Sequence, residues 1–203
     1  MNNDSIRSSE ISSMSFEELI DLNCFGADET EKNAAAEILE KHYGCQIVVG
    51  EMAKSVKFGH HARGCTIIAA KICENVVIMQ NVTIGTNMKF NRTSEQWENV
   101  GNPILDRNVV VADGAKILGP VIIGENTVIG AGALITKDIP PNSVAYGTNQ
   151  YKPKDPNYDY IFHNRMIEPD AIVKVNQRRI EEFKRGRTGG MGDDTGNRAF
   201  DAP

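Results

Sequence analysis

The stretch LDRNVVVADGAKILGPVIIGENTVIGAGALI, residues 105–135, places an aliphatic side chain at every sixth position. The repeating residues are Leu105, Val111, Ile117, Ile123, Ile129 and Ile135. Two positions before each later member stands a small or apolar residue: Val109, Ala115, Val121, Thr127 and Ala133. A period of six fits neither an amphipathic helix, with a period near 3.6, nor a strand that alternates every two residues. The repeat predicts a solenoid in which three short strands form a triangular turn of about 18 residues around an aliphatic core.

The composition predicts one domain with short appendages. The chain has 203 residues, of which 40% are hydrophobic and 24% charged, as in an ordinary globular protein. Its net charge of −5 disfavours nucleic acid or an anionic membrane as the main partner. No apolar run approaches the roughly 20 residues that span a bilayer, and the polar N-terminus lacks the apolar core of a signal peptide. We therefore expect a cytoplasmic protein.

Four cysteines, Cys24, Cys45, Cys65 and Cys73, contain no CxxC pair, and the four histidines do not supply matching zinc spacing. We expect reduced and mostly buried thiols, because free cysteine behaves as a small hydrophobic residue. The sequence gives no support for a metal site. A cysteine nucleophile remains open but unsupported.

The solenoid is expected to begin after a helical segment over residues 15–44, itself preceded by a disordered stretch, residues 1–14. Ser15 and Glu18 form a capping box ahead of a short helix that runs to about Cys24. A second helix is predicted from about Glu29 to Tyr43, with Gly44 as its stop. These helices could pack across the first coil or support an oligomer, and the sequence does not choose between the two.

A C-terminal extension, residues 148–185, is expected after the solenoid. It begins irregularly and ends in a helix over EPDAIVKVNQRRIEEFKR, residues 168–185, with Pro169 in the first turn. The tail, residues 186–203, is glycine-rich and predicted to be disordered. The basic residues of the helix are expected to form a solvated face, with phosphate binding as the less favoured alternative: Arg178, Arg179, Lys184, Arg185 and Arg187.

Counting back in sixes from Ile84 extends the solenoid to residues 45–147. The inward positions are then Ile84, Ile78, Ile72, Thr66 and His60, and their companions are Val82, Val76, Ala70, Gly64 and Phe58. This register places the histidine His60 where an aliphatic residue should stand. Such departures from local pattern concentrate at functional sites, so His60 is a candidate functional residue.

The six-residue step fails between residues 86 and 104. Leu105 lies 21 positions beyond Ile84, and the polar intervening stretch holds the chain's single tryptophan, Trp97. Long loops in compact domains are commonly functional or disordered. We expect an extruded loop that shapes a substrate site through Phe90, Trp97 and Asn102; the alternative is a surface excursion whose Trp97 packs back on its own coil.

Two stretches resemble the hexapeptide-repeat acyltransferases. HHARGCTIIAAKICENVVIMQNVTIG, from His60 to Gly85, is similar to the serine acetyltransferases, in which a histidine opens the coil and a Q-x-VT-aliphatic-G segment closes it. VVVADGAKILGPVIIGENTVIGAGALITKDIPPNSVAYG, residues 109–147, looks like the C-terminal coils of serine, galactoside and maltose acetyltransferases. Together they cover about 80 of the 203 residues.

The resemblance implies a left-handed parallel β-helix, a homotrimer with active sites in the grooves between subunits, and acetyl-CoA as co-substrate near the C-terminal coils. The family's contacts to acetyl-CoA match Asp113, Ala131, Thr136 and Lys137. Small residues such as Ala131 would let the pantetheine arm approach backbone amides closely. Each of these four could equally be a corner or surface residue.

The resemblance assigns the catalytic place to His60. Direct transfer of acetyl to an alcohol needs a base that takes the hydroxyl proton near neutral pH, and imidazole titrates in that range. Backbone N–H groups would stabilise the developing oxyanion. His61 is the alternative base, since a shift of one residue in the uneven first coil would exchange the two.

The sequence departs from serine acetyltransferases at positions that concern the acceptor. Gly59 stands where the family has an aspartate, and Gly101 and Asn102 replace an Arg-His pair that binds the amino acid's carboxylate. A residue to orient the imidazole is not evident, with Gln46 and Glu51 as guesses. We therefore expect the acceptor to be a hydroxyl of a sugar, sugar nucleotide or polysaccharide. Serine is the alternative, and a non-catalytic β-helix scaffold is the alternative from another class.

Overall fold

The computed structural model describes residues 10–158 and 169–188. These fall into two compact units, Met1–Tyr160 and Ile161–Pro203, which are described separately. The second unit contains the predicted C-terminal helix as α4 (Pro169–Thr188), which ends three residues later than expected, and its described side chains are all exposed. Among the described residues no helix is both long and apolar enough to cross a bilayer. The expected disordered tail lies outside the described residues beyond residue 188.

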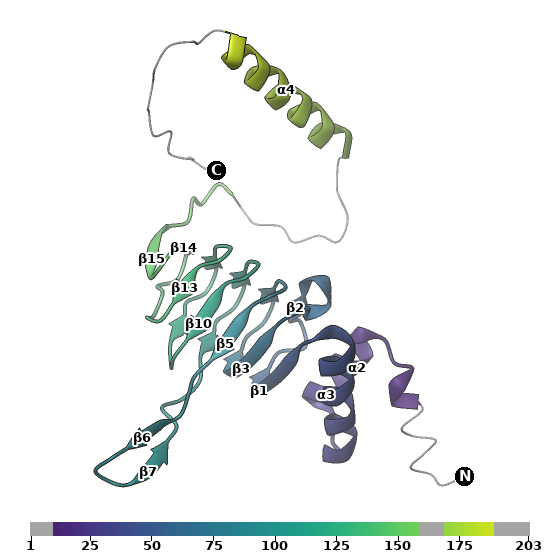
Figure 1. Ribbon diagram of the computed structural model, residues 1–203, viewed down its shortest axis with the longest axis vertical. Helices are drawn as coiled ribbons and strands as arrows, with labels where there is room; N and C mark the ends of the chain where they lie inside the picture. Colours follow the sequence, from purple (N-terminus) through teal and green to yellow (C-terminus); the bar gives the residue numbers. More distant parts are fainter. Residues whose placement is uncertain (1–9, 159–168, 189–203) are drawn as a thin grey trace. The chain divides into compact units, whose positions relative to one another are not determined.

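The first unit is a parallel β-solenoid of five turns with three flat faces (Figure 1). The first face carries the front halves of β1 (Gln46–Met52) and β3 (Thr66–Ile72), then β5 (Thr83–Gly85), β10 (Lys116–Leu118) and β13 (Leu134–Ile135). The second face carries the back halves of β1 and β3, then β8 (Ile104–Leu105) and β11 (Ile122–Ile123). The third face carries β2 (Lys57–Phe58), β4 (Val77–Ile78), β9 (Val110–Val111), β12 (Val128–Ile129) and β14 (Ser143–Tyr146). The predicted β-helix is therefore confirmed.

The core of this solenoid is the aliphatic repeat. All six residues of the repeat from Leu105 to Ile135 are 0% exposed, and their smaller companions are buried beside them. Strands of successive turns align the repeat, as where Ile117 lies opposite both Ile84 and Ile135. The six-residue step is thus the spacing from one face to the next. Burial of the aliphatic side chains at these positions supplies the hydrophobic stabilisation of the whole solenoid.

The register predicted for the first two turns is wrong. Ile67, not Thr66, points inward: Ile67 is 0% exposed and pairs with Ile84, while Thr66 is exposed. The reason is a five-residue step from Ile67 to Ile72, because β3 runs unbroken across the corner between two faces. Phe58 takes the inward place on the third face, opposite Ile78. His60 therefore does not replace a core aliphatic residue; it lies beyond β2 in the following corner.

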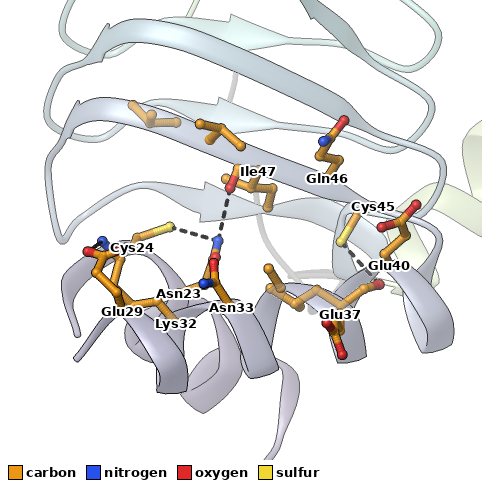
Figure 2. A pocket seen from close by; sticks show the side chains of 14 residues that line it. Asn23, Cys24, Glu29, Lys32, Asn33, Glu37, Glu40, Cys45, Gln46 and Ile47 are labelled. Carbon is orange, nitrogen blue, oxygen red and sulfur yellow. Dashed lines mark hydrogen bonds and ion pairs between the residues drawn. The ribbon is translucent and has the colours of Figure 1, made fainter. Parts of the chain in front are cut away.

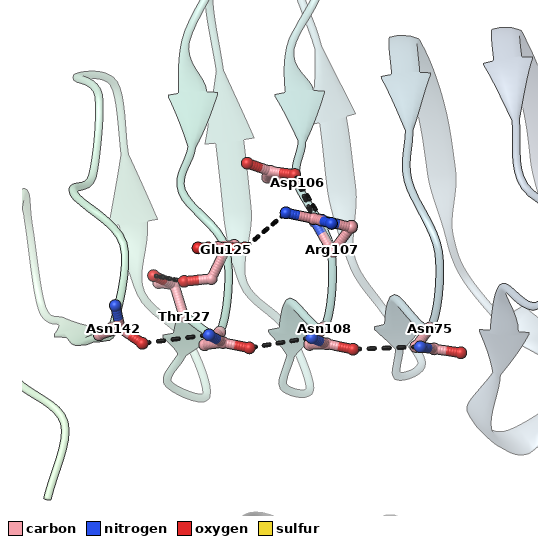
Figure 3. A network of polar contacts seen from close by, with 8 residues as sticks. Asn75, Asp106, Arg107, Asn108, Glu125, Thr127 and Asn142 are labelled. Carbon is pink, nitrogen blue, oxygen red and sulfur yellow. Dashed lines mark hydrogen bonds and ion pairs between the residues drawn. The ribbon is translucent and has the colours of Figure 1, made fainter. Parts of the chain in front are cut away.

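The corner between the second and third faces is formed by a ladder of asparagines (Figure 3). Each adopts the left-handed backbone conformation, which asparagine tolerates better than most residues: Asn75, Asn108, Asn126 and Asn142. Their side-chain amides donate in sequence from Asn75 to Asn108, Asn126 and Asn142, at 3.1, 2.9 and 3.1 Å. The ladder satisfies the side chains of one turn with those of the next and fixes the stacking of this corner.

Two helices cover the first coil, α2 (Phe16–Phe25) and α3 (Glu29–Tyr43) (Figure 1). The predicted capping box of Ser15 and Glu18 is present, and Gly44 ends α3 in the left-handed conformation. The Asn23 amide donates to the Ile47 carbonyl at 3.0 Å and joins α2 to β1. The expected disorder of residues 1–14 is wrong where it can be checked, because residues 10–12 are helical and Ile11 is buried. Residues 1–9 lie outside the described residues.

All four cysteines are free, and two of them lie at a hollow between the helices and β1 (Figure 2). Cys24 and Cys45 line this hollow of about 470 Å³ together with Asn23, Leu39 and Ile47. Burial raises the pKa of each of these two thiols to about 11. Burial also raises the pKa of Cys65 and Cys73. Because only the thiolate is a good nucleophile, this environment argues against catalysis by a cysteine.

These thiols predict a loss of stability in alkali. A thiol whose pKa is about 11 in the folded chain and about 8.5 in the unfolded chain keeps its proton longer when folded. Its contribution is fully present below about pH 8.5 and is lost as the pH rises through the folded value of about 11. We expect the free energy of unfolding, measured in urea, to fall between these limits.

Replacing one cysteine measures how much its thiol contributes to the decrease in the free energy of unfolding at alkaline pH. Cys24→Ala should show a shallower decline than the unaltered protein over the same pH range, since one of the two strongly shifted groups is gone. Equal slopes in the two proteins would contradict the assignment.

Two segments expected to be irregular are strands. The extruded loop contains an antiparallel hairpin of β6 (Lys89–Asn91) and β7 (Gln96–Glu98), which projects from the stack (Figure 1). After the last coil, β15 (Gln150–Pro153) turns back and pairs antiparallel with β14. We refer to residues 86–103 as the arm. The arm leaves the solenoid between β5 and β8, at the corner between the first and second faces.

Candidate functional site

The predicted base lies in the histidine corner, residues 59–64, which connects β2 on the third face to β3 on the first. Three successive residues here have left-handed backbone angles: His60 (φ 51°), His61 (φ 55°) and Ala62 (φ 49°). For residues other than glycine this conformation costs about 1–2 kcal/mol each. Strain of this kind persists only where the surroundings impose it, and it is concentrated at functional sites.

Burial and hydrogen bonds at Ala62 and Cys65 fix the C-terminal end of this turn. Ala62 is 0% exposed, and its carbonyl accepts a hydrogen bond from the Cys65 N–H at 3.0 Å. The Cys65 thiol donates to the Met79 carbonyl of the next turn at 3.2 Å. The buried end of the turn is therefore anchored in the core, while both histidine side chains remain exposed.

The two histidines differ in their contacts. The His61 ring lies against two aromatic rings of the helical segment, with centroid distances of 5.2 Å to Phe16 and 5.7 Å to Tyr43. Phe16 also contacts Tyr43 at 5.0 Å and Phe58 at 6.3 Å. Within the part of the chain that the structure describes, the His60 imidazole makes no ring contact and no side-chain hydrogen bond. His60 is thus the histidine that is available to a ligand.

Successive corners stack above the histidine corner and form one edge of the prism, the histidine edge (residues 59–64, 79–81, 112–114 and 130–132). Backbone hydrogen bonds join each level to the next, from Asn81 to Arg63 at 2.8 Å and from Gly132 to Asp113 at 2.9 Å. The Asn81 amide also donates to the Asp113 carboxylate at 3.0 Å. Two of the predicted acetyl-CoA contacts, Asp113 and Ala131, therefore share an edge with His60.

The other two predicted contacts lie on a different edge. Thr136 and Lys137 follow β13 at the corner between the first and second faces. The Thr136 N–H donates to the Asn149 side chain at 2.7 Å, and the Asn149 amide donates back to the Thr136 hydroxyl at 2.8 Å. Lys137 is exposed. Within one chain, the four predicted contacts are therefore divided between two edges.

The predicted acceptor residues belong to the arm and share the edge of Thr136 and Lys137. Phe90 and Trp97 face each other across the hairpin with ring centroids 5.4 Å apart. Trp97 is 65% exposed, so the alternative in which it packs back on its own coil is wrong. Asn102 is half-buried where the arm returns to β8. A single chain thus separates these residues from His60.

The base of the arm covers a hollow that the sequence did not indicate. Its volume is about 350 Å³, and its lining includes Thr83, Thr86, Lys89 and Val100. The Thr86 hydroxyl is buried without a hydrogen-bond partner among the described residues, and so is the side-chain carbonyl of Gln80 on the histidine edge. Buried polar atoms are seldom left unpaired, so these two are candidates for contact with a ligand or partner. A lone threonine in a polar stretch carries no pattern that would have marked it.

Neither guess for a residue that orients the imidazole is supported. Glu51 lies on the second face, where its carboxylate accepts a hydrogen bond from Lys71 at 2.8 Å that lowers the pKa of Glu51. Gln46 lies on β1, opposite Thr66 of β3. In the described ranges no carboxylate hydrogen-bonds to His60 or His61.

Among the described residues no group of three His, Cys, Asp or Glu side chains is placed to hold a metal ion.

Comparison with known proteins identifies relatives of this solenoid. The bacterial transferase hexapeptide family (six repeats) matches residues 102–137. The serine acetyltransferase of Mycobacterium tuberculosis is 34% identical over 115 residues, which cover 56% of this chain and 47% of that protein. The galactoside O-acetyltransferase of Lactococcus lactis is 40% identical over 72 residues, which cover 34% of this chain and 35% of that protein. The chain therefore spans about half or less of the length of these two relatives.

A solved structure shows the same fold. The crystal structure of serine acetyltransferase from Brucella abortus matches with a TM-score of 0.51 and 19% identity, covering 68% of this chain and 54% of that chain. The matched repeat contains the core residues from Leu105 to Ile135. Residues 102–137 thus carry the repeat of the matched hexapeptide family, and the parallel β-helix resembles the fold of that serine acetyltransferase.

Proposed function

We propose that this protein is an acetyl-CoA-dependent O-acetyltransferase with His60 as its general base. The observation that carries the proposal is the placement of an exposed, otherwise unengaged histidine on a strained corner, on the same edge as Asp113 and Ala131. The named acetyltransferases among its relatives support this chemistry.

In the proposed reaction, the His60 imidazole takes the proton of the acceptor hydroxyl as the oxygen attacks the thioester carbonyl of acetyl-CoA. The carbon–sulfur bond of the resulting tetrahedral intermediate then breaks. The coenzyme A sulfur leaves and recovers the proton from the imidazolium, so the base returns to its neutral form. Backbone N–H groups at the site would stabilise the oxyanion.

The proposed site is completed by a second copy of the chain. The arm and His60 lie at different edges of one prism, so a single chain cannot place Phe90 and Trp97 beside the base. In a homotrimer, the edge of one subunit faces an adjacent edge of the next. The arm of one subunit would then close over the histidine edge of its neighbour, with acetyl-CoA in the groove between them.

The relatives favour serine as the first acceptor to test. The match to a serine acetyltransferase extends over 115 residues, whereas the galactoside O-acetyltransferase matches over 72. The absence of a cation at Gly101 and Asn102 favours a saccharide hydroxyl as the second candidate, because a carboxylate would need a charged partner there. Lys89, in the hollow at the base of the arm, is a cation that could take that part.

An acceptor panel distinguishes these candidates. Release of free coenzyme A from acetyl-CoA would be followed with a thiol reagent in the presence of serine, a galactoside, maltose or a sugar nucleotide. We expect turnover above hydrolysis with one acceptor class, and product mass increased by one acetyl group. If none of the acceptors gave release of coenzyme A, the result would support the scaffold alternative. Release of coenzyme A at the same rate with and without an acceptor would identify a hydrolase.

A further inference from the structure

We propose that Phe16 of α2 and Tyr43 of α3 are positioning residues that hold the His61 ring and thereby fix the turn that presents His60. This inference rests on the proposed function of His60. It gives the N-terminal helices an indirect role in the reaction. It also distinguishes the two adjacent histidines: ring contacts fix His61, and His60 remains available as the base.

The first support is the convergence of three chain segments on one ring. Phe16 begins α2, Tyr43 ends α3, and His61 lies in the histidine corner, yet the three rings contact one another pairwise at 5.0, 5.2 and 5.7 Å. Phe16 is only 5% exposed, so its contact with His61 belongs to the packed part of the helical segment. Edge-to-face contacts of this kind fix the orientation of a ring.

The second support is the unusual backbone of the corner. The equivalent corners on the histidine edge each use one left-handed residue of a tolerant type: Asn81, Gly114 and Gly132. The histidine corner has Gly64 at the equivalent place and, in addition, three left-handed residues in succession that are neither glycine nor asparagine: His60, His61 and Ala62. The other corners turn with one such residue, so the three additional ones require stabilisation from elsewhere. The His61 contacts with α2 and α3 lie outside the coil and supply it.

The geometry therefore separates the two candidate bases. Tertiary contact holds His61 by its ring in the aromatic cluster (Phe16, Tyr43, Phe58 and His61), while the adjacent His60 makes no ring contact with that cluster. A loss of the ring contacts would allow the turn to relax and displace the His60 imidazole. A displacement of about 1 Å at a catalytic group can reduce a rate by about a hundredfold.

The test compares variants in the same helices that do and do not touch His61. Phe16→Ala removes the ring contact, whereas Leu19→Ala removes a fully packed side chain one turn later in α2. Assayed below the melting temperature of both, Phe16→Ala should lower kcat by about tenfold or more relative to Leu19→Ala. KM for acetyl-CoA should change by less than about twofold in either, because the ring contacts of the helices on this edge are with His61 and not with the predicted acetyl-CoA contacts Asp113 and Ala131.

A second pair at Tyr43 keeps the test decisive if Phe16→Ala does not fold. Tyr43→Phe retains the ring and should keep the kcat of the unaltered protein, while Tyr43→Leu should lower it by about tenfold. Folded His61→Phe, which keeps an aromatic ring but cannot accept a proton, should retain turnover. Equal kcat in Tyr43→Phe and Tyr43→Leu, or a folded His61→Phe as inactive as a His60 variant, would overturn the inference. Failure of the proposed function is distinct, since the unaltered protein would then show no acetyl transfer.

Discussion

Replacement of His60 by asparagine is expected to lower kcat for acetyl transfer by on the order of 10²–10⁴-fold, the usual contribution of a general base. Asparagine suits the test because it tolerates the left-handed backbone of this position. The chain itself uses asparagine at similar angles, for instance at Asn75 and Asn81, both with φ 58° against 51° at His60. The variant should therefore fold and stack normally while it lacks a side chain that can take a proton.

The measurement is kcat and KM with the best acceptor of the panel, together with a thermal melt. We expect KM for acetyl-CoA to remain within about threefold, because His60 is assigned to the proton transfer and not to binding. His42→Asn is the matched control: His42 is an exposed histidine in the last turn of α3 and should keep full activity. Unchanged kcat in His60→Asn would remove the base assignment and direct attention to His61.

The solenoid itself could be predicted because one physical constraint repeats along it. Each face needs one inward aliphatic side chain, and the spacing between faces is six residues from Ile72 to Ile84 and from Leu105 to Ile135. The arm could be predicted because the six-residue spacing is interrupted there. That the arm would form a hairpin with Phe90 against Trp97 was not indicated, because its cross-strand pairs are set by the turn and not by the repeat.

The candidate site could be predicted only in part. The six-residue count identified His60 by placing it at an inward position, and that placement is wrong. The same segment is nevertheless unusual, because its backbone has three successive left-handed residues. Gly59 and Gly64 at either end were the local signal that this corner is expanded. The contact of Phe16 and Tyr43 with His61 was beyond reach, because it joins the helices to the coil over long sequence separations that no periodicity reports.

The register in the first turns gives the second large expected effect, on stability. Ile67→Ala should lower the free energy of unfolding by about 2–5 kcal/mol, the range for truncating a buried aliphatic side chain. Ile67 is 0% exposed and lies between Ile47 of the turn below and Ile84 of the turn above. Its truncation would leave a cavity at the level where the solenoid passes from its regular turns to the histidine corner. The rigid neighbouring turns cannot collapse to fill that cavity.

Thr66→Ala is the matched comparison, since the six-residue count placed Thr66 inside and the structure places it on the surface. It should change the free energy of unfolding by no more than about 0.5 kcal/mol, as surface substitutions do. Urea unfolding of both variants would be measured at one protein concentration, because the proposed trimer would make apparent stability depend on concentration. A larger effect at Thr66 than at Ile67 would restore the uninterrupted six-residue register. That register would return His60 to the interior, where it could not serve as an exposed base.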